Sequence, residues 1–225
     1  MKVESNLALN IASRTIFTVL GMIAGFFLVR YLGPEKYGLL GDYTAILSFV
    51  TALGSLGLIE SLSKTLVSQK KNQQNITVAR GVLVYTVLGL VYGVTIILLG
   101  GSINRFLNLS VSLGFYVILG IHIFLYLVNG FLEKILEATN ITHLISYTQT
   151  AAIIFRVLSI IIIIIFKLSY IYVLLVELMM TIMYITTYFR YIARVYIFPF
   201  AAGRTKFSWD WSWFIRIFRY GLAVY

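Results

Sequence analysis

Residues Leu144 to Tyr188 read LISYTQTAAIIFRVLSIIIIIIFKLSYIYVLLVELMMTIMYITTY, which is two long apolar runs on either side of Lys167. A helix that crosses the ~30 Å hydrocarbon core of a bilayer needs about 20 consecutive, mostly apolar residues. Each run is long enough, and the connection between them is too short for anything but a tight turn. The stretch therefore predicts two antiparallel membrane-spanning helices, Leu144–Phe166 and Leu168–Tyr188.

Four more runs of this kind precede them, and the same criterion predicts a helix for each: Leu7–Leu32, Leu39–Ser63, Val82–Asn104 and Val111–Leu132. Another begins near Ile215 and is still apolar at Tyr225. We therefore predict an all-α integral membrane protein with a six-helix transmembrane bundle at residues 1–189. The start of a seventh helix is expected at 215–225, in a chain that is a fragment or one half of a transporter.

The segment between them, residues 190–214, is rich in aromatic side chains. It contains Ser208-Trp209-Asp210-Trp211-Ser212-Trp213-Phe214. Tryptophan favours the headgroup level of a bilayer. We expect an amphipathic linker that lies on the inner membrane surface.

Composition supports a lipid environment and excludes several classes of function. Hydrophobic residues make up 60% of the chain and charged residues 12%, against about 25% charged in soluble domains. The net charge of +10 is carried by loops between apolar runs, where it suits contact with anionic membrane lipids, so no nucleic-acid partner is expected. There is no cysteine, and no phosphate loop, nucleophile elbow or metal-ligand spacing. We expect neither an enzyme nor a cofactor or metal site.

The distribution of Lys and Arg predicts the orientation. With the N-terminus in the cytoplasm, twelve of these residues fall on the inner side and four, namely Arg30, Lys36, Arg105 and Lys167, on the outer side. Cytoplasmic loops carry the excess of positive charge in membrane proteins. This predicts a cytoplasmic N-terminus and an even number of spans.

Charged residues inside predicted spans are costly and usually face a partner or a cavity. Arg156 lies eleven residues before Lys167, and Glu177 lies ten after it. At ~1.5 Å per residue both are ~15 Å deep. We predict an ion pair between them, or two neighbours lining one aqueous cavity; their role is a structural tie or a part of the transport path.

The second predicted span carries two more carboxylates, each with two interpretations. Arg30 and Asp42 each lie six residues from Lys36, so we expect them at the same depth in the membrane. There they could form a pair that closes the hairpin near the outer face. Asp42 and Glu60 are eighteen residues apart, which places them on one helix face. Glu60 either pairs with Lys64 at i+4 or lines a vestibule.

Arg14 lies about two turns inside the first predicted helix. Thr18, Gly21 and Gly25 fall on nearly the same stripe, and small residues let helices approach closely. This face should pack against protein. Arg14 either snorkels to the inner surface or offers its guanidinium to an anionic head group such as a pyrophosphate.

Five short stretches carry a recognisable pattern: Asn10–Arg14 (NIASR), Val29–Leu39 (VRYLGPEKYGL), Leu53–Leu58 (LGSLGL), Ser61–Leu66 (SLSKTL) and Arg219–Leu222 (RYGL). In these stretches the chain resembles the polysaccharide-biosynthesis, or O-antigen, flippases of the multidrug/oligosaccharidyl-lipid/polysaccharide exporter superfamily. The resemblance is most specific over about the first 70 residues.

This resemblance implies two similar lobes around a central, typically cationic cavity, in the cell (plasma) membrane. The chain would be the N-terminal lobe and would need a C-terminal lobe as its partner. The implied activity moves a lipid-diphosphate-linked oligosaccharide from the inner to the outer leaflet by alternating access. Arg14 and Arg30 match arginines of the family's opening, which makes them candidates for head-group contact.

Two other functions stay open on the residues alone. An ion-coupled exporter of small amphiphiles or drugs would use Asp42, Glu60 or Glu177 as its coupling carboxylate. A membrane enzyme of lipid-linked sugars would need a sizeable outer loop with catalytic side chains, and every predicted outer loop is short.

Overall fold

The computed structural model describes residues 2–55, 57–198, 215, 217 and 219, with the backbone alone at 2–14, 16, 17, 71 and 72. Its elements are all helices: α1 (Lys2–Ser55), α2 (Leu58–Ser68), α3 (Lys71–Leu107), α4 (Leu113–Ala138), α5 (Thr142–Ile165), α6 (Ile171–Ile192) and a π-helical turn, η1 (Ala193–Ile197). The described residues contain no strand. The predicted all-α class is therefore confirmed.

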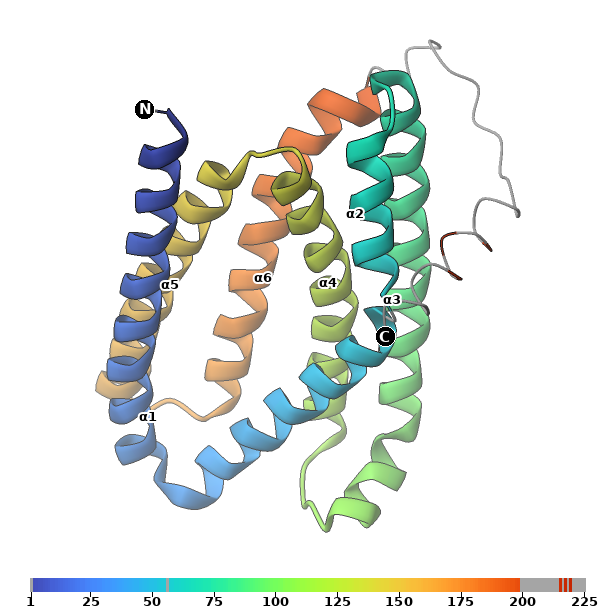
Figure 1. Ribbon diagram of the computed structural model, residues 1–225. Helices are drawn as coiled ribbons and strands as arrows, with labels where there is room; N and C mark the ends of the chain where they lie inside the picture. The colour runs from blue at the N-terminus through green and yellow to red at the C-terminus, as the bar shows by residue number, and fades with distance from the viewer. Residues whose placement is uncertain (1, 56, 199–214, 216, 218, 220–225) are drawn as a thin grey trace.

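The first predicted span is the first leg of α1, and most of the second predicted span is its second leg; α1 reverses direction at Gly33 between them (Figure 1). Gly33 has φ 76° and ψ 169°, a region that is accessible essentially to glycine alone. Pro34 follows, and it also disfavours a helical conformation in the residue before it. The expected outer loop is thus a single-residue reversal between a first leg, residues 2–32, and a second leg, residues 34–55.

The second predicted span does not continue as one straight helix. Gly57 adopts a left-handed conformation with φ 69°, and α1 and α2 meet there at an angle of 48°. A left-handed residue interrupts the helical hydrogen bonding and rotates the next segment. The prediction that Asp42 and Glu60 share one helix face is therefore wrong, because the break at Gly57 lies between them.

Within the part of the chain that the structure describes, four helices are long and apolar enough to cross a membrane: Gln73–Leu107, Leu113–Ala138, Thr142–Ile165 and Ile171–Ile197. A fifth span results if the bent pair of α1 and α2 counts as one. The chain is therefore a multi-pass helical membrane protein. The expected count of six treats the two legs of α1 as separate spans, and it stays a prediction.

The connections alternate between the two ends of the bundle (Figure 1). The reversal of α1 and the α3–α4 and α5–α6 connections lie at one end, which we call the turn end. The start of α1, the α2–α3 and α4–α5 connections and η1 lie at the other, the N-terminal end. This matches the predicted alternation of loops; which end faces the cytoplasm stays a prediction.

Only part of the chain after residue 189 is described, so the predicted division into a lobe, a linker and a seventh helix stays a prediction. Helical structure continues beyond residue 189 through α6 and η1 to Ile197, and the rest of the predicted linker, 199–214, lies outside the described residues. Residues 215, 217 and 219 are helical. Ile217 is buried, and its carbonyl oxygen accepts a 3.1 Å hydrogen bond from the Ser61 hydroxyl.

Helices α3 and α4 cross with their backbones in contact. A Cβ added at Gly93 would lie 2.5 Å from the carbonyl oxygen of Gly120, and one added at Gly120 would lie 2.6 Å from that of Gly93. Such close approach is possible only where both helices lack side chains. These two glycines fix how α3 packs on α4.

Two apolar clusters hold the helices together. The larger includes residues of the second leg and of α2, α3, α4 and α6. The smaller ties the first leg to α5 and the start of α6 through Ala24, Leu28, Ile160, Ile163 and Val173. The buried residues of the two legs of α1 therefore belong to different clusters, and both legs line one cavity.

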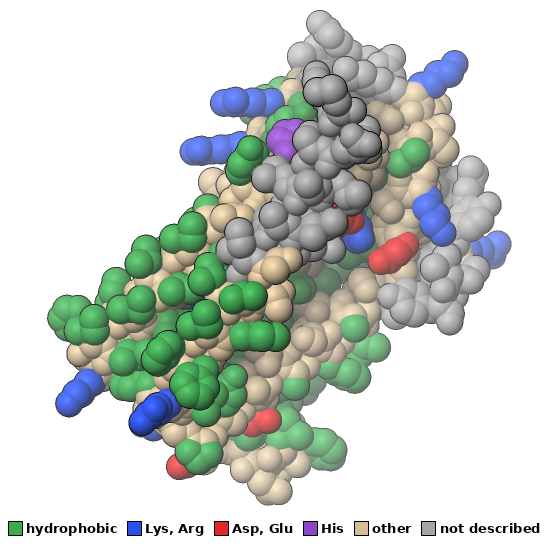
Figure 2. Space-filling model, turned by 60° about the vertical axis from the view of Figure 1, so that its left-hand side comes forward, with side chains coloured by type: hydrophobic (Ala, Val, Ile, Leu, Met, Phe, Trp, Pro, Cys, Tyr) green, Lys and Arg blue, Asp and Glu red, His purple; other side chains and the backbone are tan. Residues whose placement is uncertain are grey.

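The outer surface carries large apolar side chains. Phe26, Leu98 and Phe106 are 64%, 77% and 85% exposed. In Figure 2, hydrophobic side chains cover most of the lower half of the visible face, with Lys and Arg at its ends. An apolar band of this kind is what lipid chains require of a membrane protein's exterior.

Candidate functional site

A polar cavity of about 510 Å³ opens among both legs of α1, α4, α5 and α6. Its size lies within the range of about 300–1,000 Å³ that is usual for ligand pockets. The lining residues are Thr18, Tyr43, Thr44, Leu47, His122, Tyr126, Asn129, Glu133, Gln149, Glu177, Met180, Thr181, Tyr184 and Tyr188. Polar and aromatic groups outnumber the two aliphatic ones, so this interior site is suited to a polar ligand.

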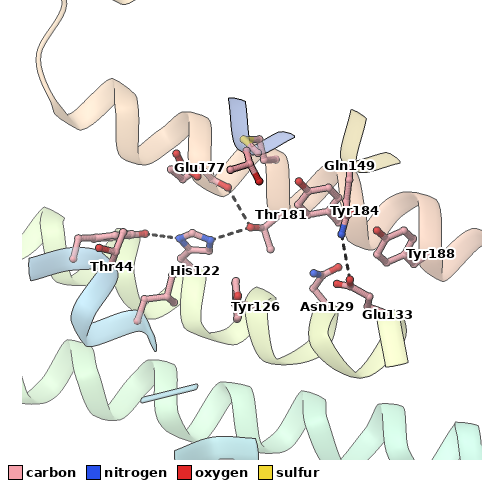
Figure 3. Close-up of a pocket in the computed structure, with 14 residues that line it drawn as sticks. Thr44, His122, Tyr126, Asn129, Glu133, Gln149, Glu177, Thr181, Tyr184 and Tyr188 are labelled. Carbon is pink, nitrogen blue, oxygen red and sulfur yellow. Dashed lines mark hydrogen bonds between the residues drawn. The ribbon is translucent and has the colours of Figure 1, made fainter. Parts of the chain in front are cut away.

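A chain of hydrogen bonds crosses one side of the cavity through His122 (Figure 3). Tyr43 Oη lies 2.7 Å from His122 Nδ1, and His122 Nε2 lies 2.9 Å from Thr181 Oγ1. Thr181 donates its hydroxyl proton to the carbonyl oxygen of Glu177 at 3.1 Å. Because that proton is used, Nε2 must be the donor to Thr181, and Nδ1 accepts from Tyr43. The neutral Nε2–H tautomer thus joins the second leg of α1, α4 and α6.

The opposite side of the cavity holds a second polar group, on α4, α5 and α6 (Figure 3). Gln149 Nε2 donates to Glu133 Oε1 at 3.3 Å. Beside them, Asn129 is 7% exposed and Tyr188 is fully buried. Their Oδ1 and Oη atoms have no hydrogen-bond partner within the described part of the chain. This corner of the cavity therefore has unused hydrogen-bonding capacity.

The predicted pair between Arg156 and Glu177 is confirmed. Arg156 Nη2 and Glu177 Oε1 lie 2.6 Å apart, and each side chain is 26% exposed. A Cβ added at Gly21 would lie 3.9 Å from Arg156 Nη1, so the guanidinium occupies space beside the first leg of α1. The pair links α5 to α6 next to the cavity, and Glu177 is one of the cavity's lining residues.

The described part of the cavity lining contains none of the cations that the family resemblance implies. Its described lining includes two carboxylates, Glu133 and Glu177, and neither lysine nor arginine. The guanidinium of Arg156, beside the cavity, is already engaged by Glu177. The cationic cavity that the resemblance implies stays a prediction.

The two arginines that the resemblance selects do not meet in the structure. Arg14 belongs to the helical backbone of α1, and its side chain lies outside the described residues. Arg30 is exposed, three residues before the reversal at Gly33, and it is not among the residues that line the cavity. The head-group role of both arginines stays a prediction.

The expected pair between Arg30 and Asp42 is absent from the side chains that the structure describes. The two legs of α1 pack on different helices: the first leg meets α5, whereas Asp42 lines a shallow groove between the second leg and α3. Equal predicted depths in the membrane therefore do not bring these two side chains together.

The expected pair between Glu60 and Lys64 is also absent among the described side chains, although both lie on α2. Lys64 is exposed, whereas Glu60 points inward and its Oε2 atom is buried without a hydrogen-bond partner. Glu60 interacts electrostatically with Lys134 of α4. It is not one of the residues that line the cavity.

Sequence reasoning missed most of the cavity. The charges and motifs considered in the sequence single out neither His122 nor Glu133. The signal was present, because His122, Tyr126, Asn129 and Glu133 follow one another at intervals of four, three and four residues. That spacing places them on one face of a helix. A polar stripe on one face of a membrane-spanning helix indicates a cavity or a partner.

Comparison with known proteins identifies the family. A family model described as "Polysaccharide biosynthesis protein" matches residues 4–225, which is nearly the whole chain. No curated protein and no solved structure matches this chain. The chain therefore belongs to the polysaccharide biosynthesis protein family.

Proposed function

We propose that this chain is the N-terminal lobe of a flippase that carries a lipid-diphosphate-linked oligosaccharide across the plasma membrane. The lobe would work with a C-terminal lobe, with its N-terminus in the cytoplasm, and would move its substrate to the outer leaflet by alternating access. Membership of the polysaccharide biosynthesis family and the multi-pass helical architecture support this proposal.

The observation that carries the proposal is the polar cavity inside a bundle of apolar helices. The head group of such a lipid must cross a ~30 Å hydrocarbon core, so it needs a route lined by hydrogen-bonding groups. A cavity with His122, Asn129 and Gln149 in its wall provides such groups within the span.

Arg14 is the proposed contact for the diphosphate. It lies one helical turn before Thr18, and Thr18 lines the cavity. A guanidinium matches the geometry of phosphate oxygens and keeps its charge when it is partly buried. Arg30, near the turn end, is proposed to meet the diphosphate as it leaves at the outer face.

A second candidate is an ion-coupled exporter of small amphiphiles. The observation that favours it is the presence of Glu133 and Glu177 in the cavity wall. A carboxylate that faces a cavity inside a membrane can bind and release a proton or sodium ion. In that case transport would require an ion gradient and would be lost when Glu133 or Glu177 is neutralised.

A translocation assay tests the first proposal. The protein, together with its second lobe, is placed in liposomes with a short-chain lipid-diphosphate oligosaccharide, and the sugar that reaches the far side is measured. We expect translocation by the natural protein, loss with Arg14→Ala and retention with Arg105→Ala, which removes an exposed cation at the end of α3. No translocation by a folded natural protein would overturn the flippase function. Normal translocation by the Arg14→Ala variant would overturn the role of this arginine.

A further inference from the structure

We propose that Glu60 and Tyr85 bind a sodium ion at the break between α1 and α2. Glu60 lies on α2 and Tyr85 on α3, and neither residue lines the polar cavity. The inference goes beyond the proposed function, because it assigns an ion to a separate part of the lobe and does not depend on which substrate the lobe carries.

The first observation is the carboxylate of Glu60, which lies in the first turn of α2. Its Oε2 atom is buried and has no hydrogen-bond partner within the described part of the chain, and Glu60 forms no ion pair there either. A carboxylate that is buried in its charged form without a partner is unstable, so it takes up a proton or is paired with a cation. Glu60 therefore has a place for a small cation.

The lysines near Glu60 do not fill that place. Lys134 of α4 interacts electrostatically with Glu60, but its Nζ atom lies 2.6 Å from Glu137 Oε2, and that ion pair balances its charge. Lys64, one turn further along α2, is exposed. The negative charge of Glu60 thus has no cation in contact with it among the described side chains.

The second observation is the hydroxyl of Tyr85. This side chain is fully buried, yet its Oη atom has no hydrogen-bond partner in the described chain. The ring stacks on Phe131 of α4, with centroids 4.9 Å apart and planes 11° from parallel, and the hydroxyl interacts electrostatically with Glu60. Two buried oxygen atoms on neighbouring helices therefore act on each other and lack partners. An ion bound between them would satisfy both.

The third observation is the break itself. The helix α1 ends at Ser55 and α2 begins at Leu58, and left-handed Gly57 lies between them at the 48° bend. The last carbonyl groups of a helix have no partner inside it, and they carry the negative end of its dipole. In secondary transporters, such carbonyl groups of discontinuous helices bind sodium ions. The end of α1, five residues before Glu60, thus supplies oxygen atoms of the kind that sodium needs.

Charge and ligand type favour sodium over a divalent metal. One carboxylate and neutral oxygen atoms provide a single negative charge, which matches a monovalent cation. Calcium sites use several carboxylates and zinc sites use histidine and cysteine, whereas the described residues contain no group of three such side chains that could hold a metal. A small cation also suits closely packed helices, which favours sodium over potassium.

Direct binding tests this site. The full chain in lipid nanodiscs is incubated with radioactive sodium, and the bound radioactivity is measured against rising NaCl, KCl or choline chloride. We expect saturable binding that NaCl displaces and that KCl and choline chloride displace at least about tenfold less well. Glu60→Gln should abolish this binding, and Tyr85→Phe should weaken it about tenfold, because it removes one oxygen ligand. The assay contains no lipid-linked substrate, so its result is independent of transport.

Stability separates a sodium site from a purely structural role of the two residues. Sodium should raise the melting temperature of the natural protein and leave that of the Glu60→Gln variant unchanged. Without sodium, Tyr85→Phe should be at least as stable as the natural protein, because it loses a buried hydroxyl that has no partner. Glu35→Gln, which neutralises an exposed carboxylate next to the reversal of α1, is the matched control and should keep full sodium binding.

The inference is overturned if no saturable sodium binding is found, which is the result expected of a carboxylate that takes up only a proton. It is equally overturned if potassium displaces sodium as well as sodium itself does, or if Glu60→Gln or Tyr85→Phe binds sodium like the natural protein. Translocation of the lipid-linked substrate by a protein that binds no sodium overturns the site and leaves the flippase function intact. Sodium binding without translocation does the reverse.

Discussion

Arg156 on α5 and Glu177 on α6 form an ion pair, with Nη2 and Oε1 2.6 Å apart. Arg156 lies near the middle of α5, and Glu177 lies about two turns from the start of α6, inside helices that are apolar enough to cross a membrane. An unpaired charge at that depth is costly, so the pair fixes α5 against α6 at one register. It also leaves Glu177 at the edge of the cavity.

Removal of one partner should therefore destabilise the lobe. Arg156→Leu or Glu177→Leu leaves an uncompensated charge, which costs about 3–5 kcal/mol when fully buried; with a quarter of each side chain exposed, we expect about 2–3 kcal/mol. The double variant should recover much of this loss. Thermal unfolding of the three variants in detergent supplies the double-mutant cycle. Strictly additive losses would contradict a coupled pair.

The reversal of α1 gives a second prediction. Gly33→Ala should destabilise the protein by about 1–3 kcal/mol, because φ 76° with ψ 169° is strained for a residue with a side chain. The cost arises from backbone conformation alone, since nothing lies within 4 Å of an added Cβ. Gly41→Ala is the control: it also has open space but is helical, so alanine should be neutral or slightly stabilising. Equal melting temperatures for the two variants would refute the strain at Gly33.

The crossing of α3 and α4 gives a third prediction. Gly120→Leu places side-chain atoms against the backbone of Gly93, whose carbonyl oxygen would be only 2.6 Å from the new Cβ. Backbone cannot move aside as a flexible side chain can, so the overpacking should cost at least about 1–3 kcal/mol. Size-exclusion recovery and thermal unfolding measure the loss. Gly101→Leu, with nothing within 4 Å, should behave like the natural protein.

The hydrogen bonds of His122 give a fourth prediction. His122→Phe keeps the ring but leaves the Tyr43 hydroxyl and Thr181 without their partner, which should cost about 1–3 kcal/mol. Tyr43→Phe removes one bond only and should cost less. Denaturant unfolding of both variants compares them. A His122→Phe protein as stable as the natural one would show that the network does not hold the second leg of α1 to α4 and α6.

The sequence predicted the helices and the Arg156–Glu177 pair because both depend on residue counts. A tight turn at Lys167 and a fixed rise per residue set the depth of each charge, and two adjacent antiparallel helices leave little freedom for partners. The same reasoning failed for Arg30 and Asp42. Their predicted depths were equal, but the two legs of α1 pack against different helices. A residue count gives no information about the rotation of a helix about its own axis.

The break at Gly57 and the cavity were harder to predict from the sequence, because both depend on how the helices are rotated and packed. A glycine inside an apolar run is common in membrane helices, so Gly57 alone did not predict a left-handed residue. The polar stripe of α4 was readable from its spacing. Its partners, Gln149 on α5 and Tyr188 on α6, could be assigned only once the packing of the helices was known.

The measurement that tests the central claim most directly is transport through a cavity that has been filled. Thr44→Trp puts a large side chain into the cavity lining, whereas Ser102→Trp puts the same side chain into the separate groove beside α3. If the substrate crosses through the cavity, lipid-linked oligosaccharide translocation in liposomes is lost with Thr44→Trp and kept with Ser102→Trp, with both proteins folded. Equal translocation by the two variants would contradict this route.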